Sequence, residues 1–188
     1  MNKTELRIKY IEKRRKLTQQ EKEILANSIS TILFANFKLT KKIISLFLPI
    51  EKKNEINTFP IWEKAVLQKC SITVPVSNFE NMELKHIKLT TKDQLTINKH
   101  GIPEPNKGEE ISSKSIDYVI VPLLTFDAKG NRIGYGKGFY DRFLNECTEK
   151  CIFIGLTFFE DTEEIEDINE HDIRLDYCIT PTQLIQFK

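Results

Sequence analysis

The sequence is poor in the residues that build zinc sites and disulfide frameworks. Its 188 residues include four cysteines and three histidines. No two cysteines form a C-x-x-C pair, and none stands at zinc-ligand spacing from a histidine. We therefore expect reduced thiols in or near the core of a cytoplasmic protein. The chain also lacks an apolar run of about 20 residues, and no apolar segment follows its basic start, so we expect neither a membrane span nor a secretory signal.

An excess of charge of one sign is missing as well. The 28 Lys and Arg residues nearly balance 27 Asp and Glu residues, and the formal net charge of +1 argues against a general nucleic-acid binder. A composition of 40% hydrophobic and 29% charged residues is typical of a soluble domain. The chain has no repeat, low-complexity segment or linker, and its length suits one core. We expect a single domain over residues 1–188 that works as a monomer and binds small molecules.

Glycine is scarce too, and more than half of it is concentrated in one stretch. Of the seven glycines, four lie in the glycine loop, Gly130–Gly138. An apolar run at 118–124 precedes this loop and is typical of a buried strand, and apolar residues at helical spacing follow from Phe139. A strand, a glycine loop and a helix start together point free N–H groups and a positive dipole end at an anion. Arg132 and Lys137 add full charges, so the stretch predicts a phosphate site.

The two most familiar glycine patterns are absent from this loop. A P-loop needs Ser or Thr after its Gly-Lys pair, but Gly138 follows Lys137. The Rossmann fingerprint needs G-x-G-x-x-G, whereas Gly134, Gly136 and Gly138 alternate. A plain glycine hairpin between two core elements is the simplest alternative. The two cations and the following F-Y-D-R sequence disfavour that alternative.

The stretch from 121 to 144 resembles the signature of the 5-formyltetrahydrofolate cyclo-ligase (methenyltetrahydrofolate synthetase) family. The matching residues are Pro122, Phe126, Asp127, Gly130, Arg132, Gly134, Gly136, Gly138, Tyr140, Asp141 and Leu144. The chain start is similar to the family's K-x-x-L-R segment, which holds the nucleotide phosphates, and the matching residues are Lys3, Leu6 and Arg7. A family E-I-x-T motif, whose glutamate faces the pterin and formyl group, is matched by Glu55, Ile56 and Thr58.

Periodicity predicts the fold class independently of the resemblance. Apolar runs predict strands at 42–49, 71–76, 118–124, 151–158 and 177–180. Helical spacing predicts helices at 3–16, after the capping box Thr18–Glu21, at 61–69 and from Phe139. Strands that alternate with helices indicate βαβ units. We therefore predict an α/β fold, a single three-layer α/β/α domain with a mostly parallel central sheet, Rossmann-like in kind.

Several segments carry expectations about exposure. The basic run Lys13–Lys16 and the acidic connection Asp161–Glu170 are expected to be solvated. The segment Gly101–Pro105 is expected to be a rigid turn with Glu104 in solvent. It resembles a family G-I-x-E-P segment that borders the folate pocket, so contact of Glu104 with substrate stays open. Residues 82–89 alternate as an outer strand would, and Pro75 indicates a sheet edge or a strand end.

The resemblance implies the ATP-dependent cyclisation of 5-formyltetrahydrofolate to 5,10-methenyltetrahydrofolate, with release of ADP and phosphate through phosphorylation of the formyl oxygen. The implied catalytic residues are Lys137, Arg132 and Tyr140. The implied ATP-binding residues are Lys3, Thr4, Glu5, Leu6, Arg7, Arg132, Ile133, Gly134, Tyr135, Gly136, Lys137, Gly138, Phe139 and Tyr140. The implied substrate-binding residues are Ile50, Glu55, Tyr135, Gly136, Lys137, Gly138 and Phe139.

The resemblance also implies Mg²⁺, with ATP as co-substrate. Asp141 and Asp176 are the candidate carboxylates, the second from a family H-D-x-x-x-D pattern that His171, Asp172 and Asp176 match. Asp141 has an alternative role, because a carboxylate in the first turn of a helix is stabilising without any metal.

Two other classes of protein stay open on the residues alone. A sugar-phosphate isomerase or CoA-transferase-like protein also binds anions on glycine loops, but it would not need the K-x-x-L-R segment. A non-enzymatic module could use the basic first helix to bind RNA or acidic partners, and it would leave the glycine loop unexplained.

Overall fold

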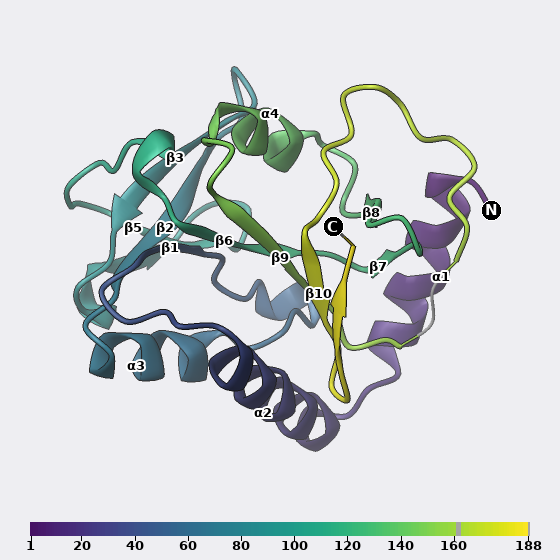
Figure 1. The fold of residues 1–188 in the computed structure, drawn as a ribbon, viewed down its shortest axis with the longest axis horizontal. Coiled ribbons are helices and arrows are strands. Elements are labelled where there is room, and N and C mark those ends of the chain that lie inside the picture. The colour runs from purple at the N-terminus through teal and green to yellow at the C-terminus, as the bar shows by residue number, and fades with distance from the viewer. Residues whose placement is uncertain (161–162, 188) are drawn as a thin grey trace.

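A seven-stranded mixed sheet forms the middle of the molecule in the computed structural model, which describes residues 1–160 and 163–187. The strand order is β11-β10-β9-β6-β1-β2-β3 (Figure 1). The five parallel strands are β1 (Ile43–Leu46), β2 (Ser71–Asn78), β6 (Tyr118–Pro122), β9 (Ile152–Leu156) and β10 (Tyr177–Ile179). The antiparallel strands β3 (Glu83–Lys88) and β11 (Leu184–Gln186) close the two edges. The predicted mostly parallel sheet is confirmed.

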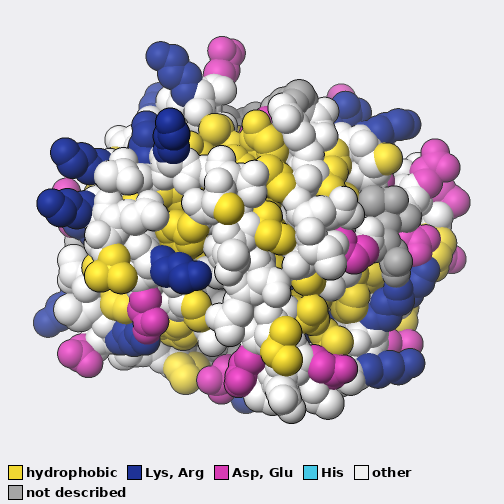
Figure 2. All heavy atoms as spheres, turned by 60° about the horizontal axis from the view of Figure 1, so that its bottom comes forward, with side chains coloured by type: hydrophobic (Ala, Val, Ile, Leu, Met, Phe, Trp, Pro, Cys, Tyr) yellow, Lys and Arg dark blue, Asp and Glu magenta, His cyan; other side chains and the backbone are white. Residues whose placement is uncertain are grey.

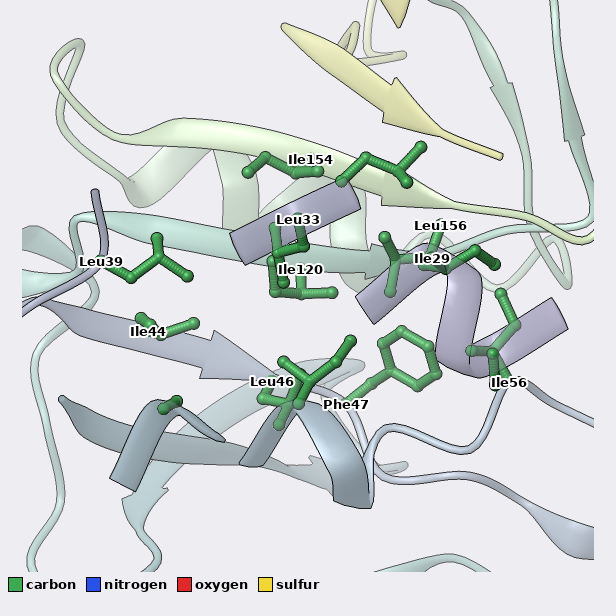
Figure 3. Packing of buried hydrophobic residues seen from close by; sticks show 14 of the residues in the cluster. Ile29, Leu33, Leu39, Ile44, Leu46, Phe47, Ile56, Ile120, Ile154 and Leu156 are labelled. Atoms are coloured by element: carbon green, nitrogen blue, oxygen red, sulfur yellow. The ribbon is translucent and has the colours of Figure 1, made fainter. Parts of the chain in front are cut away.

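Helices cover both faces of this sheet. The helices α2 (Gln19–Asn36) and α3 (Phe59–Leu67) lie on one face, and α4 (Phe139–Glu146) lies on the other (Figure 1). Successive side chains of β6 point to opposite faces of the sheet. Ile120 belongs to the core cluster that contains Ile29 of α2, whereas Val121 belongs to the cluster that contains Phe143 of α4. Figure 3 shows Ile29 and Leu33 against the inward side chains of β1, β6 and β9. The three-layer prediction is therefore correct.

The first helix, α1 (Lys3–Arg15), packs to one side of the sheet beside the hairpin of β7 (Thr125–Phe126) and β8 (Arg132–Ile133) (Figure 1). Its side chains Leu6 and Tyr10 are fully buried against Leu124 and Ile133. Smaller elements complete the fold: β4 (Leu95–Ile97) pairs with β5 (Pro103–Pro105), and the 3-10 turns are η1 (Glu51–Lys53), η2 (Lys92–Gln94) and η3 (Ser113–Ser115).

Local chemistry explains where the first two helices begin. Asn2 accepts hydrogen bonds from the backbone N–H groups of Thr4 and Glu5, and Glu5 accepts one from the N–H of Asn2. Thr18 and Glu21 form the predicted capping box at the start of α2. Both boxes satisfy N–H groups that a helix start leaves unpaired.

The parallel strands follow the doubly wound order 2-1-3-4-5 when they alone are numbered along the chain. The order reverses between β1 and β6, so the chains that leave the carboxyl ends of these two strands diverge. Such a switch point opens a crevice in which ligands of α/β sheets bind. The functional site is therefore expected beyond Leu46 and Pro122.

Two expectations about exposure are wrong for single buried side chains. Glu104 is 9% exposed, and its carboxylate accepts hydrogen bonds from the Ser77 N–H and the Asn98 amide, both at 2.8 Å. Glu104 lies in β5, and its carboxylate is buried because it satisfies the Ser77 N–H of β2, which would otherwise lack an acceptor. Arg14 is 3% exposed, since it lies on the face of α1 that packs on the molecule.

Residues 83–88 form the outer strand β3, as expected. The expectation that Pro75 marks a sheet edge or a strand end is wrong, because Pro75 lies within β2, between β1 and β3, and pairs with His86. A residue without an N–H is tolerated there because Pro75 lies beyond the part of β2 that pairs with β1. The acidic connection is mostly exposed from 163 to 170, while Asp161 and Thr162 lie outside the described residues. This connection also holds the start of α1, because Glu166 pairs with the N-terminal amine at 2.8 Å and Asp167 accepts from the Lys3 N–H at 2.7 Å.

All four cysteine side chains are free, and those of Cys151 and Cys178 are buried. Within residues 1–160 and 163–187, no helix combines the length and the apolar character needed to cross a membrane.

Candidate active site

A cleft of about 1060 Å³ lies at the carboxyl ends of β1 and β6, at the switch point of the sheet. Segments far apart in the sequence form its walls: the start of α1, the loop after β1, the glycine loop, the first turn of α4 and the segment before β10. The side chains that line the cleft include Lys3, Arg7, Ile50, Lys53, Glu55, Phe79, His100, Arg132, Tyr135, Lys137, Phe139, Tyr140, Asp141 and Asp172.

The loop after β1 is held in place by the residues of the E-I-x-T motif. The Glu55 carboxylate turns back and accepts a hydrogen bond from the Ile50 N–H at 2.8 Å. The Thr58 hydroxyl donates to the Phe47 carbonyl oxygen at 2.6 Å. These two bonds close the loop on itself, and Glu55 is left 9% exposed in the cleft wall rather than in solvent.

Within the glycine loop, Gly134 and Gly136 differ in what they require. Gly136 has φ +81°, in the left-handed region that favours glycine, and a Cβ atom there would lie 2.8 Å from the Arg7 guanidinium carbon. Gly134 has no such φ, and a Cβ atom there would meet nothing within 4 Å. Gly136 is therefore required by the protein itself, whereas the space at Gly134 opens into the cleft.

The basic segment of α1 reaches this loop directly. The Arg7 guanidinium Nε donates to the Gly134 carbonyl oxygen at 3.0 Å. One turn earlier, the Lys3 ammonium pairs with Asp172 at the cleft wall. The structure thus brings the K-x-x-L-R segment and the glycine loop together, which the spacing alone could not show.

The other two cations of the cleft have different environments. Arg132 is 7% exposed, and its guanidinium donates to the Asp141 carboxylate at 2.7 Å and to the Ile173 carbonyl oxygen. The Lys137 ammonium lies 4.9 Å from the Phe79 ring centroid. Among the residues that the structure describes, no carboxylate lies within ion-pair distance of Lys137, so its charge is available to an anionic ligand.

A buried polar network lies behind Glu55. The Tyr135 hydroxyl accepts a hydrogen bond from Arg14 Nη1 at 2.9 Å and interacts electrostatically with Glu55. Burial raises the pKa of Glu55, and the Ile50 N–H, Tyr135 and the Arg14 charge oppose this rise. Burial also raises the pKa of Tyr135 and of Tyr140, so both phenols keep their protons.

Lys53 completes this end of the cleft. Its ammonium lies 3.9 Å from the Tyr135 ring centroid. Burial lowers the pKa of Lys53, whereas the nearby Glu55 raises it. Glu55, the two phenols and Lys53 therefore meet at one wall, and Arg14 contacts Tyr135 outside the cleft lining.

The two candidate metal carboxylates are not brought together. Asp141 lines the cleft, and its described hydrogen bonds, from Arg132 at 2.7 Å and from the Ile173 N–H at 3.2 Å, all reach Oδ1. Asp176 directly precedes β10, so it lies at the amino edge of the parallel sheet, where its carboxylate accepts from the Phe153 N–H at 2.8 Å. Its role as a metal ligand stays a prediction that this geometry does not support.

Residues of the implied ATP-binding segments fall into two groups. Lys3 and Arg7 face the cleft, as do Phe139 and Tyr140 of α4. The glycine-loop residues Arg132 and Gly134–Gly138 line the cleft as well. Leu6, Ile133 and Glu5 serve the fold instead, since Leu6 and Ile133 are core residues and Glu5 closes the capping box. Thr4 is exposed.

Sequence reasoning missed several residues of this region. Phe79 and His100 lie in a tilted ring contact at a centroid distance of 4.0 Å, and Phe79 meets Phe139 edge-on at 5.3 Å, so three aromatic rings line this part of the cleft. No motif marks either residue. Asp172 could have been found as the first aspartate of the H-D-x-x-x-D pattern, and Arg14 was hidden in a run of basic residues.

Comparison with known proteins gives one consistent result. The model of the 5-formyltetrahydrofolate cyclo-ligase family matches residues 1–181. The 5-formyltetrahydrofolate cyclo-ligase of Mycoplasma genitalium is 29% identical over 183 residues, which cover 95% of this chain and 98% of that protein. The enzyme of the same name from Mus musculus is 29% identical over 146 residues, covering 72% and 71%.

Solved structures agree with the sequence comparisons. The NMR structure of 5,10-methenyltetrahydrofolate synthetase from Aquifex aeolicus superposes with a TM-score of 0.80 at 28% identity, covering 100% of this chain and 94% of that one. A 5,10-methenyltetrahydrofolate synthetase from Mycoplasma pneumoniae superposes with a TM-score of 0.77 at 25% identity, covering 95% and 98%.

Proposed function

Since the chain belongs to the 5-formyltetrahydrofolate cyclo-ligase family, we propose that the cleft converts 5-formyltetrahydrofolate and ATP into 5,10-methenyltetrahydrofolate, ADP and phosphate. One observation carries the assignment of the site. Within the cleft, the Arg7 guanidinium of α1 donates a hydrogen bond to the Gly134 carbonyl oxygen and lies close to the Cα of Gly136. The two sequence segments that the reaction needs for one triphosphate are therefore in contact.

The need for ATP follows from the chemistry of the formyl group. A formamide carbon is a poor electrophile, and its oxygen cannot leave as oxide. Transfer of the γ-phosphoryl group to this oxygen gives an iminium-like phosphate ester. The neighbouring amine nitrogen attacks its carbon, and phosphate then departs with the former formyl oxygen. The protein has to hold the two substrates in line and neutralise the charge that moves.

The nucleotide end of the cleft is assigned to α1 and the glycine loop. Lys3 and Arg7 face the space beside Gly134, and Lys137 stands at the N-terminus of α4, where its charge adds to the helix dipole. Because Lys137 is held between Gly136 and Gly138, it is placed to meet charge on the bridging and γ oxygens during transfer. Arg132 forms an ion pair with Asp141 of α4, and this pair helps to hold the glycine loop in place.

The folate end is assigned to Glu55 and the three aromatic rings. A carboxylate that accepts from the Ile50 N–H still has an oxygen for the amide and amine donors of a pterin ring. Phe79, His100 and Phe139 offer ring faces and edges on which a flat heterocycle can pack. Ile50 and Tyr135 line the same end.

The cleft also fits the Mg²⁺ that accompanies ATP in such reactions. Mg²⁺ is usually held by one or two carboxylates together with substrate phosphates and water. Asp141 lines the cleft with Oδ2 turned away from its described hydrogen bonds, so this oxygen would hold the ion. Within the described residues no cluster of three or more ligating side chains occurs, which suits an ion bound mainly by phosphate oxygens. Bound there, the ion would neutralise phosphate charge.

We further propose that the protein is a single domain over residues 1–188 and acts as a cytoplasmic monomer on small molecules. In support of one domain, the cleft lies on a single central sheet that helices cover on both faces. A module that binds RNA through a basic surface is not favoured. On the face in Figure 2, Lys and Arg side chains alternate with Asp, Glu and hydrophobic side chains rather than forming a continuous basic surface.

A turnover assay tests this function. Purified protein should produce the near-ultraviolet absorbance of the methenyl product from 5-formyltetrahydrofolate only with ATP and Mg²⁺, with one ADP formed per product. Glu55→Gln should weaken folate binding and leave ATP binding nearly unchanged, because Glu55 lies at the folate end. Glu51→Gln, an exposed neighbour, is the matched control. Release of formate, or product without ATP, would exclude the assignment.

A further inference from the structure

A buried arginine on α1 contacts the polar network at the folate end but does not line the cleft. Arg14 is 3% exposed, and it lies two turns from Arg7 on the same face of the helix. Its Nη2 donates to the Leu123 carbonyl oxygen, just past β6, at 2.7 Å, and its Nη1 donates to the Tyr135 hydroxyl at 2.9 Å. Within the described residues no carboxylate lies within ion-pair distance of Arg14, and its Nε has no hydrogen-bond partner.

An arginine with this little exposure and no direct counter-ion is costly unless its charge is balanced nearby. Glu55 is the carboxylate that interacts with the Arg14 charge, and it also interacts with the Tyr135 hydroxyl that Arg14 holds. Arg14, Tyr135 and Glu55 therefore belong to one buried polar network. The packing of α1 alone does not explain why a charged side chain is buried at position 14. A role in this polar network does.

We propose that Arg14 is a positioning residue for the folate carboxylate: its hydrogen bond fixes the Tyr135 hydroxyl beside Glu55, and its guanidinium places a buried positive charge in the same network. This inference rests on the proposed function. A phenol has one proton and accepts through its lone pairs. Because the Tyr135 oxygen accepts from Arg14, its own proton is left for Glu55, the carboxylate with which this hydroxyl interacts.

The same helix then supports both ends of the site. Arg7 holds the glycine loop at Gly134, and Arg14 holds the next residue, Tyr135. The nucleotide contacts and the folate carboxylate are therefore set by one rigid element, α1.

The ionisation of Glu55 also depends on its other neighbours. Arg14 faces it from α1, Tyr135 from the glycine loop, Tyr140 from α4, and Lys53 from η1. Lys53 is the only other cation among these, and its own pKa is lowered by burial. Removing Arg14 should therefore raise the pKa of Glu55, because the carboxylate loses its buried positive neighbour.

The test compares pH profiles of kcat/KM for 5-formyltetrahydrofolate at saturating ATP. Arg14→Met and Tyr135→Phe should each move the acidic limb upward by about one pH unit and raise the folate KM about tenfold, with the ATP KM nearly unchanged. Arg14→Lys should restore part of the pH shift, since it keeps the charge without the two-nitrogen fork. Arg15→Gln, the exposed neighbour on α1, should match the wild type. The double variant should shift no further than either single one.

The outcomes separate this inference from a purely structural role. If Arg14→Met melts earlier but keeps the wild-type acidic limb and folate KM, Arg14 only anchors α1 and the inference is wrong. If Arg14→Met does not fold, Tyr135→Phe decides, since it removes a single oxygen atom.

Failure of the proposed function is recognised separately, as a wild-type protein that does not convert 5-formyltetrahydrofolate. In that case carboxyl-labelled glutamate followed by ¹³C NMR, with the Glu55 signal identified by its loss in Glu55→Gln, still reports the ionisation. An unshifted Glu55 titration in Tyr135→Phe would overturn the inference.

Discussion

Replacement of Gly136 by alanine tests how the glycine loop and α1 depend on each other. Gly136 has φ +81°, and an added Cβ would lie 2.8 Å from the Arg7 guanidinium carbon and 3.0 Å from its Nε. The backbone strain is unavoidable, because an L side chain disfavours this region. The contact is relieved only if the Arg7 side chain moves, which would break its hydrogen bond to the Gly134 carbonyl oxygen.

The expected loss of stability in Gly136→Ala is the sum of the backbone strain and the lost hydrogen bond. A non-glycine residue in the left-handed region costs about 1–2 kcal/mol. Loss of one hydrogen bond from a half-buried guanidinium adds roughly 1 kcal/mol. In a chain of this length each kcal/mol corresponds to about 2–4 °C, so we expect the Tm of Gly136→Ala to fall by about 4–12 °C. The displaced Arg7 should also raise the ATP concentration needed for half-maximal rate.

Gly134→Ala is the matched control for this prediction. A Cβ at Gly134 meets nothing within 4 Å and the residue has no positive φ, so its Tm without ligand should stay within about 2 °C of the wild type. Because that Cβ would project into the cleft, ligand binding should weaken even though stability does not. Thermal melts with and without ATP, together with ATP titrations, provide both readings. Equal melting temperatures for the two variants, or an unchanged ATP requirement in Gly136→Ala, would refute the reasoning.

Three further predictions concern single side chains of the cleft and core. Lys137→Ala should lower the rate at saturating ATP by about 10²–10³, whereas Arg7→Ala should mainly raise the ATP KM; equal losses of saturated rate would contradict separate roles. Asp141→Asn should raise the Mg²⁺ requirement and cost no more than about 1–2 kcal/mol of stability, since the amide oxygen still accepts from Arg132; lost stability with unchanged Mg²⁺ dependence would leave Asp141 a structural partner only. His86 is 2% exposed and stacked on Phe143, and burial lowers its pKa from 6.5 to about 4. Between pH 6.5 and pH 4 the unfolded chain therefore binds more protons at His86 than the folded protein does. His86 should lower the free energy of unfolding by about 2 kcal/mol from pH 7 to pH 5, measured by urea titration. His86→Leu should remove this contribution.

The parts of the site that the sequence predicted are those encoded by short motifs. Glycine spacing, the two cations of the loop and the K-x-x-L-R segment are local patterns with one physical meaning, an anion site, and the structure brings them into one cleft. The E-I-x-T motif is equally local, since its Glu55 and Thr58 bonds close a loop of about ten residues.

What the sequence did not predict depends on contacts between distant segments. Arg14 sits in a run of four basic residues that reads as solvated, and its burial is decided by Leu123 and Tyr135, more than 100 residues away. The segment around Glu104 has the local sequence of a turn, so Glu104 was expected in solvent. Its carboxylate is buried because it accepts a hydrogen bond from the N–H of Ser77, which is distant in the sequence.

Asp176 shows a different limit. A family pattern suggested a metal ligand, but a residue directly before a parallel strand lies at the amino edge of a sheet. The predicted strand at 177–180 already contained this information, and strand direction rather than the motif decides where the side chain lies.

The central claim is that the cleft transfers the γ-phosphoryl group of ATP to the formyl oxygen of the folate. The most direct measurement uses 5-formyltetrahydrofolate labelled with ¹⁸O in the formyl group and follows the oxygen by mass spectrometry of the released phosphate. The account predicts one ¹⁸O atom in each phosphate formed, at the same rate as the methenyl product. Phosphate free of ¹⁸O, with the label lost to water while product still forms, would contradict it.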